Sequence, residues 1–131
     1  MVFAFENIVA WQKAHQFTCL VYRITKCFPE DERYGLTSQF RRAAVSIGAN
    51  IAEGYKKFLD NAKTEREAVK LRFLNISEGS LAECQNYILL SKDLKYLSND
   101  NYILLHDYAM EVGRLLTAYC KGIINNNGVQ E

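Results

Sequence analysis

Residues 39–54, QFRRAAVSIGANIAEG, decide the fold that this sequence predicts. At about 100° per residue the apolar side chains of this stretch fall on one side of a helix, the pattern of an amphipathic α-helix. A polar stripe runs directly beside the apolar one, which predicts that another helix or another subunit covers this edge. The apolar stripe comprises Leu36, Phe40, Ala43, Ala44, Ile47 and Ile51, and the polar stripe comprises Gln39, Arg42, Ser46, Asn50 and Glu53.

Three further segments carry helical periodicity. Residues 8–28 and the segment that ends near residue 124 repeat apolar residues at alternating spacings of four and three, which is typical of the seam of a left-handed bundle. The segment that begins near Thr64 carries two apolar stripes, which is unusual for the outer helix of a monomer. A second stripe in residues 8–28 includes Trp11, the only tryptophan. These doubled stripes predict contacts between subunits.

Short polar connections separate the four predicted helices, and Pro29 ends the first of them. The sequence therefore predicts an all-α fold, an antiparallel up-down-up-down four-helix bundle. Residues 1–124 are expected to form this single domain, and residues 125–131 a flexible C-terminal tail. The predicted connections are residues 28–35, 56–63 and 93–101.

Local signals refine the predicted helices. Asn7 is a suitable N-cap for the first helix, and Thr64 with Glu67 forms a predicted capping box for the third. Gly48 lies inside the second helix, where glycine costs about 1 kcal/mol relative to alanine. It therefore predicts a bend or a close neighbour, and Gly79 in the third helix predicts a close approach between helices.

The composition limits the classes of function. The chain has 131 residues, about half of them apolar, and a net charge of +1, so it is long enough for one core but lacks the strongly basic balance of many nucleic-acid-binding domains. No signal peptide and no apolar run of about 20 residues is evident, which predicts a cytoplasmic protein without a membrane partner. The four cysteines form no CxxC motif and no histidine is seen at ligand spacing, so we expect reduced thiols, no metal and no cofactor.

Positive charge is concentrated in residues 41–72. This window holds eight basic and four acidic residues, a net charge of +4, while the rest of the chain carries −3. Basic groups interspersed with Tyr55, Phe58 and Phe73 suit phosphate contact and base stacking. The alternative is a solvated face, which the acidic neighbours favour. The predicted nucleic-acid-binding residues are Arg41, Lys56, Lys57, Lys63, Arg66, Lys70 and Arg72.

The polar stripe has two interpretations, a hydrogen-bond network with the third helix that fixes register, or a surface for a ligand or RNA. We favour the network. A di-iron bundle would carry Glu-x-x-His pairs, which are missing here, and no nucleophile accompanies the carboxylates, so no enzyme is predicted. A small-molecule enzyme would require Glu53, Glu78 or Glu83 to be essential. The predicted structural network is Gln39, Arg42, Ser46, Asn50, Glu53, Glu78 and Ser80.

Three stretches resemble the four-helix-bundle proteins that are encoded in intervening sequences of bacterial 23S ribosomal RNA genes. They are YGLTSQFRRAAVSIGANIAEG (34–54), VAWQKAHQFTCLVYRIT (9–25) and FLNISEGSLAECQNYI (73–88). The resemblance covers about residues 5–122, and many relatives carry proline at the position of Gly48. The family's motifs map onto Gln39, Arg41, Arg42, Ser46, Asn50, Glu53 and Gly54, and onto Glu78, Gly79, Ser80 and Glu83.

The resemblance implies a ring-like homo-oligomer, a pentamer, of four-helix bundles. It also implies similarity to the accessory protein of diversity-generating retroelements, which partners a reverse transcriptase and nucleic acid. Members are often called ribosomal proteins, after the location of their genes, and no catalytic residues come with the family. We therefore expect a non-enzymatic oligomer associated with RNA or a ribonucleoprotein. The alternative is a structural or protein-binding scaffold, such as a reverse-transcriptase accessory protein, without direct RNA binding.

Overall fold

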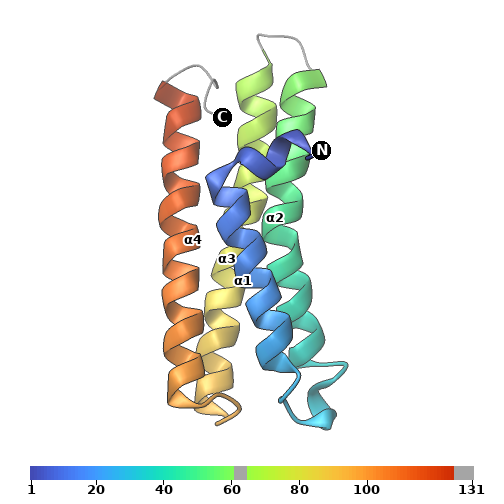
Figure 1. Ribbon diagram of the computed structural model, residues 1–131, viewed down its shortest axis with the longest axis vertical. Helices are drawn as coiled ribbons and strands as arrows, with labels where there is room; N and C mark the ends of the chain where they lie inside the picture. Colours follow the sequence, from blue (N-terminus) through green and yellow to red (C-terminus); the bar gives the residue numbers. More distant parts are fainter. Residues whose placement is uncertain (61–64, 126–131) are drawn as a thin grey trace.

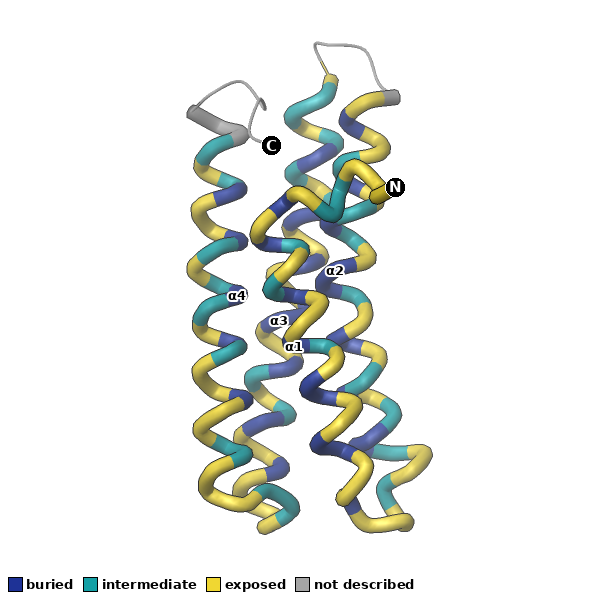
Figure 2. The backbone as a smooth tube through the Cα atoms, in the orientation of Figure 1, coloured by how far each residue is buried: buried dark blue, intermediate teal, exposed yellow. Residues whose placement is uncertain are grey.

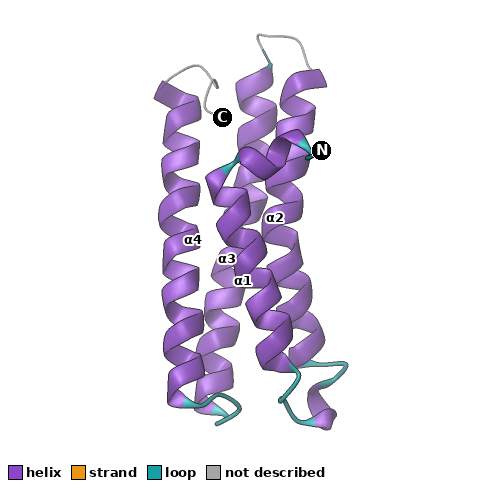
Figure 3. Ribbon diagram, in the orientation of Figure 1, coloured by secondary structure: helices purple, strands orange, loops and turns teal. Residues whose placement is uncertain are grey.

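The computed structural model describes residues 1–60 and 65–125, and within them the chain forms four α-helices and no strand. The helices lie antiparallel in sequence order, joined by short connections (Figures 1 and 3). α2 packs against α1 and α3, and α4 closes the bundle by packing against α3 and α1. The elements are η1 (Ala4–Asn7), α1 (Val9–Thr25), η2 (Glu30–Glu32), α2 (Leu36–Asp60), α3 (Arg66–Asp93) and α4 (Asn99–Asn125), where η marks a short 3-10 helix. The predicted all-α four-helix fold is confirmed at this level.

The predicted apolar stripes form the core. The α2 side chains Phe40, Ile47 and Ile51 are fully buried, and buried positions face the interior of the bundle in all four helices (Figure 2). α1 contributes Phe17 and Val21 at the same seam. No helix in the described part of the chain has the length and apolar character needed to cross a membrane.

Several predicted element bounds are corrected. α2 continues to Asp60, so residues 56–60 are helical, because they contain no glycine or proline and Phe58 adds a buried side chain to the apolar face. α1 ends at Thr25. The backbone N–H groups of Cys27 and Phe28 then donate to carbonyls three residues earlier, and this tighter turn precedes Pro29. Asn7 belongs to η1 and is not the N-cap of α1. The capping box predicted from Thr64 lies outside the described residues.

α2 and α3 make the most extensive helix–helix contact. A Cβ atom added to Gly54 would lie 2.9 Å from Cβ of Phe73 in α3, so the two backbones approach more closely than any larger residue would allow. Gly48 has a close neighbour of another kind, the ring of Trp11, whose Nε1 lies 3.4 Å from the built Cβ position. The close approach predicted for Gly79 is wrong. The position is exposed, and a Cβ atom built there has no atom of another helix within 4 Å.

Gly54 and Gly79 provide a matched pair of substitutions. We expect Gly54→Ala to destabilise the fold by about 1–3 kcal/mol, because the added methyl forces α2 and α3 apart. Gly79→Ala should stabilise it by up to about 1 kcal/mol, since alanine is the better helix former and meets no neighbour. Urea denaturation at one protein concentration measures both. Equal effects at the two positions would contradict the assigned close approach.

Candidate nucleic-acid interface

Three members of the predicted polar network meet at the α2–α3 contact. Ser80 donates a hydrogen bond from Oγ to Oγ of Ser46 at 2.8 Å. Asn50 donates from Nδ2 to the Ser46 carbonyl at 2.8 Å and to Ser46 Oγ at 3.0 Å. Ser77 adds a bond to the carbonyl of Ile47 at 2.8 Å. The half-buried Ser46 thus receives donors from both helices, which fixes how they are aligned along their length.

Two other predicted members lie beside these serines. Gln39 and Arg42 are exposed and line a groove of about 260 Å³ between α2 and α3, and Ser46, Ser80 and Glu83 line the same groove. Glu53 is also exposed, but it lines a different groove on the outer face of α2. Glu78 is exposed two residues before Ser80, on the opposite side of α3, and its charge acts on Cys120 of α4. Within one chain Glu78 therefore faces away from Ser80, and its place in the network stays a prediction.

Lys70 was predicted to contact nucleic acid, and the structure contradicts this. Its side chain is fully buried. The Nζ atom lies 4.5 Å from the ring centroid of Phe58 and 4.6 Å from that of Tyr119, with Tyr55 at 5.5 Å. This cation–π enclosure joins α2, α3 and α4 around one positive charge. The position faces the core, so Lys70 does not present its charge at the surface.

Arg41 contacts the end of α1. Its Nε donates to Oγ1 of Thr25 at 2.8 Å, its Nη2 donates to the Tyr22 carbonyl at 3.3 Å, and the guanidinium lies over the Tyr22 ring. A cation at a helix C-terminus interacts favourably with the helix dipole. Arg41 also lies about 22 Å along α2 from Lys56, at 1.5 Å per residue. It therefore supports α1 and does not share a surface with the other basic residues.

The remaining predicted basic residues gather at one end of the bundle, where α2 ends and α3 begins (Figure 1). Lys56, Lys57 and Arg72 are exposed, and Arg66 is half-buried. Arg66 lies over the ring of Phe58, and Arg72 over the ring of its neighbour in α3. Lys63 lies outside the described residues. We call Lys56, Lys57, Arg66 and Arg72 the basic end.

An aromatic arm beside the basic end was not recognised as a candidate site from the sequence. Phe3 and Phe5 stack with ring centroids 5.8 Å apart, and Phe5 packs edge-on against Trp11 at 5.1 Å. A groove of about 500 Å³ separates this arm from the outer face of α2 and includes Lys56. The sequence feature that could have indicated this site is the pair of phenylalanines in a short segment before the first predicted helix.

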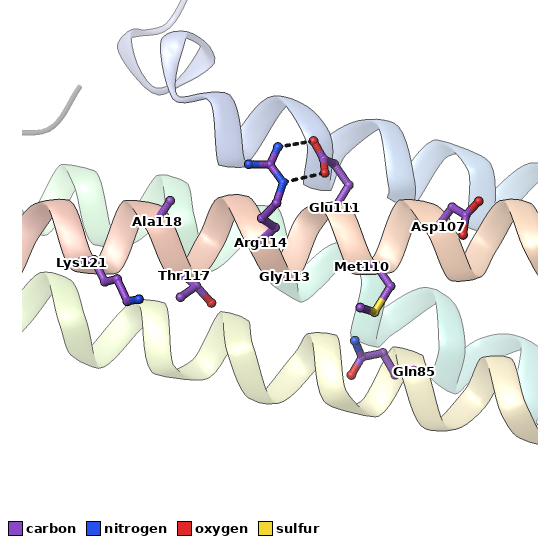
Figure 4. A pocket seen from close by; sticks show the side chains of 9 residues that line it. All are labelled: Gln85, Asp107, Met110, Glu111, Gly113, Arg114, Thr117, Ala118 and Lys121. Carbon is purple, nitrogen blue, oxygen red and sulfur yellow. Dashed lines mark hydrogen bonds and ion pairs between the residues drawn. The ribbon is translucent and has the colours of Figure 1, made fainter.

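A groove of about 780 Å³ runs along α4 and also includes Gln85 of α3 (Figure 4). Its side chains spread along the helix without converging on one point, and Glu111 is paired with Arg114, whose hydrogen bond lowers the Glu111 pKa. Glu53 and Glu83 line separate grooves, so the candidate carboxylates do not form an acid–base pair.

Cys19 and His15 form a pair of possible metal ligands, which corrects the expectation that no histidine stands at ligand spacing. Cys19 Sγ lies 3.9 Å from His15 Nε2, one helical turn apart, so a histidine does stand at ligand spacing from a cysteine. Within the described residues, no three His, Cys, Asp or Glu side chains are grouped to hold a metal ion. Two ligands alone do not make the closed coordination shell of a structural zinc site.

The fold and these surfaces define an antiparallel four-helix bundle with shallow grooves and a polar seam between its second and third helices. The family model of the 23S rRNA-intervening sequence protein matches residues 6–118, so the chain belongs to that family. The chain also resembles the crystal structure of a protein with unknown function from the S23 ribosomal protein family of Bacteroides thetaiotaomicron. That match has a TM-score of 0.72 and 23% identity, and covers 86% of this chain and 98% of that one. No curated protein matches the chain.

Thiol labelling tests the assigned burial of the cysteines. Burial raises the pKa of Cys84 to about 12 and that of Cys120 to about 11, whereas Cys19 and Cys27 are exposed. Because the thiolate is the reactive form, we expect iodoacetamide at mildly alkaline pH to modify Cys19 and Cys27 in the native protein and all four cysteines after unfolding. Mass spectrometry of digested protein reads each site. Rapid native labelling of Cys84 would contradict this core.

Proposed function

We propose that this protein is a non-enzymatic, cytoplasmic, ring-like homo-oligomer, a pentamer, that associates with structured RNA or a ribonucleoprotein through the basic end. The observation that carries the proposal is the gathering of four basic side chains beside aromatic rings at one end of α2 and α3. Phosphate contacts from such a surface supply sequence-independent affinity. Membership of a family named for an intervening sequence of 23S rRNA agrees with an RNA partner.

A second function, a structural or protein-binding scaffold, is favoured by a different observation. α3 exposes large apolar side chains, with Ile76 at 47%, Leu89 at 50% and Leu90 at 42% of their accessible surface. Leu89 and Leu90 are adjacent in the chain, and adjacent exposed apolar side chains form a patch of the kind that marks a protein contact. A scaffold such as a reverse-transcriptase accessory protein would use these side chains without binding RNA itself.

Charge reversal separates the two functions. We expect Lys56→Glu with Lys57→Glu to weaken binding to structured RNA at least tenfold and to reduce the slope of log affinity against log salt by about 1.4–1.8, because two phosphate contacts are lost. Lys26→Glu, at the opposite end of the bundle, is the matched control and should leave affinity within about twofold. Fluorescence anisotropy across a salt series measures both. An affinity that does not change between low and moderate salt would count against RNA binding.

Assembly is tested independently of RNA. We expect light scattering with size-exclusion chromatography to give the mass of an oligomer at tens of micromolar protein, for the wild type and for the Lys56/Lys57 charge-reversal variant alike. The physical reason is the exposed apolar surface of α3, which a second subunit would cover. A strictly monomeric mass would contradict the oligomer.

A further inference from the structure

The aromatic arm is attached to α1 by polar and ring contacts, although its first ring faces solvent. The backbone N–H of Phe3 donates to the Glu6 carboxylate at 2.8 Å, and the Glu6 carbonyl accepts a bond from Gln12 Nε2 at 2.7 Å. Phe5 packs against Trp11 and so anchors the arm to α1. Phe3 nevertheless keeps 72% of its surface exposed. A flat apolar ring is thus presented to solvent beside α1.

The groove beside this ring has a flat aromatic wall, a small-residue floor and a charged rim. Its volume of about 500 Å³ lies in the range of small-ligand sites. The Phe3 and Phe5 rings are parallel within 3°, an offset stack that a third ring can extend. Ala49 and Ala52 of α2 leave space opposite the rings.

We propose that this groove binds an unpaired nucleobase of RNA, stacked on Phe3, while Lys56 contacts the adjoining phosphate. The proposal rests on the proposed function and specifies its ligand as a single-stranded or extruded nucleotide. A base inside a duplex has both faces covered by its neighbours, so only an unpaired base offers a free face for stacking. Aromatic stacking beside basic side chains is the general mode of single-strand recognition.

Glu53 on the rim selects among bases. The negative charge of the Glu53 carboxylate repels a phosphate. Because an ionised carboxylate accepts hydrogen bonds and donates none, it favours a base edge that presents N–H groups. Guanine offers two adjacent donors, N1–H and the exocyclic N2 amine, which match the two carboxylate oxygens. Adenine offers only its exocyclic amine on that edge. The groove should therefore prefer guanine to adenine.

The test uses the full chain and two fluorescent blunt-ended RNA duplexes of one sequence, one with an unpaired guanosine bulge and one fully paired. We expect Phe3→Ala to weaken binding of the bulged duplex by about 5- to 150-fold, the loss of one stacked base, and to leave binding of the paired duplex unchanged. Tyr34→Ala removes another ring, 86% exposed, at the far end of the bundle and should change neither affinity.

A second pair of measurements tests the base preference. Replacing the bulged guanosine with adenosine should weaken wild-type binding, and Glu53→Gln should remove most of that difference. Phe3→Leu keeps an apolar side chain without the ring and replaces Phe3→Ala if the alanine variant does not fold, with the same loss of binding expected.

The outcomes separate this proposal from the proposed function. Wild-type affinity in Phe3→Ala and Phe3→Leu, together with loss of binding on charge reversal of Lys56 and Lys57, would overturn the nucleobase site alone. A smaller mass in solution for the Phe3 variants would identify the groove as a contact with a second copy of the chain and also overturn it. Failure of the wild type to bind either duplex would overturn both.

Discussion

The close approach of α2 and α3 is the constraint on which the rest of the structure depends. Gly54 allows the two backbones to meet at Phe73, and the bond from Ser77 to the Ile47 carbonyl fixes their alignment further along the pair. At that alignment Ser46, on the polar edge of α2, reaches Ser80. An unpartnered buried hydroxyl would cost about 1–3 kcal/mol, so the paired serines favour this register over its neighbours.

The same alignment gives the basic residues different roles. Lys70 of α3 faces the interior, where three rings surround its amino group. Lys56 of the neighbouring helix α2 faces outward. Arg41 caps α1 at the far end of the bundle. A charge count along the sequence treats these residues alike, but only side chains that reach solvent at one place form a surface for phosphate. The basic end is therefore smaller than the basic window of the sequence.

Periodicity predicted the helices and the core because burial acts on every third or fourth residue, and Phe40, Ile47 and Ile51 follow that rule. The serines at the seam could also be anticipated, since Ser46 lies directly beside the apolar stripe. The enclosure of Lys70 could not, because its three rings come from two other helices and meet only after packing. The arm at Phe3 was not predicted as a candidate site for a related reason. It is a short segment without periodicity, and only its contacts with α1 show how it is anchored.

The two candidate functions use different parts of the surface. The basic end and the aromatic arm share Lys56 and lie where α2 ends, while Leu89 and Leu90 are exposed near the opposite end of α3. About 20 residues of helix separate these regions, roughly 30 Å at 1.5 Å per residue. A subunit or protein partner on Leu89 and Leu90 would therefore leave the arm open to RNA. Self-association and RNA binding are thus compatible in one chain, and an oligomer would increase avidity by presenting several basic ends together.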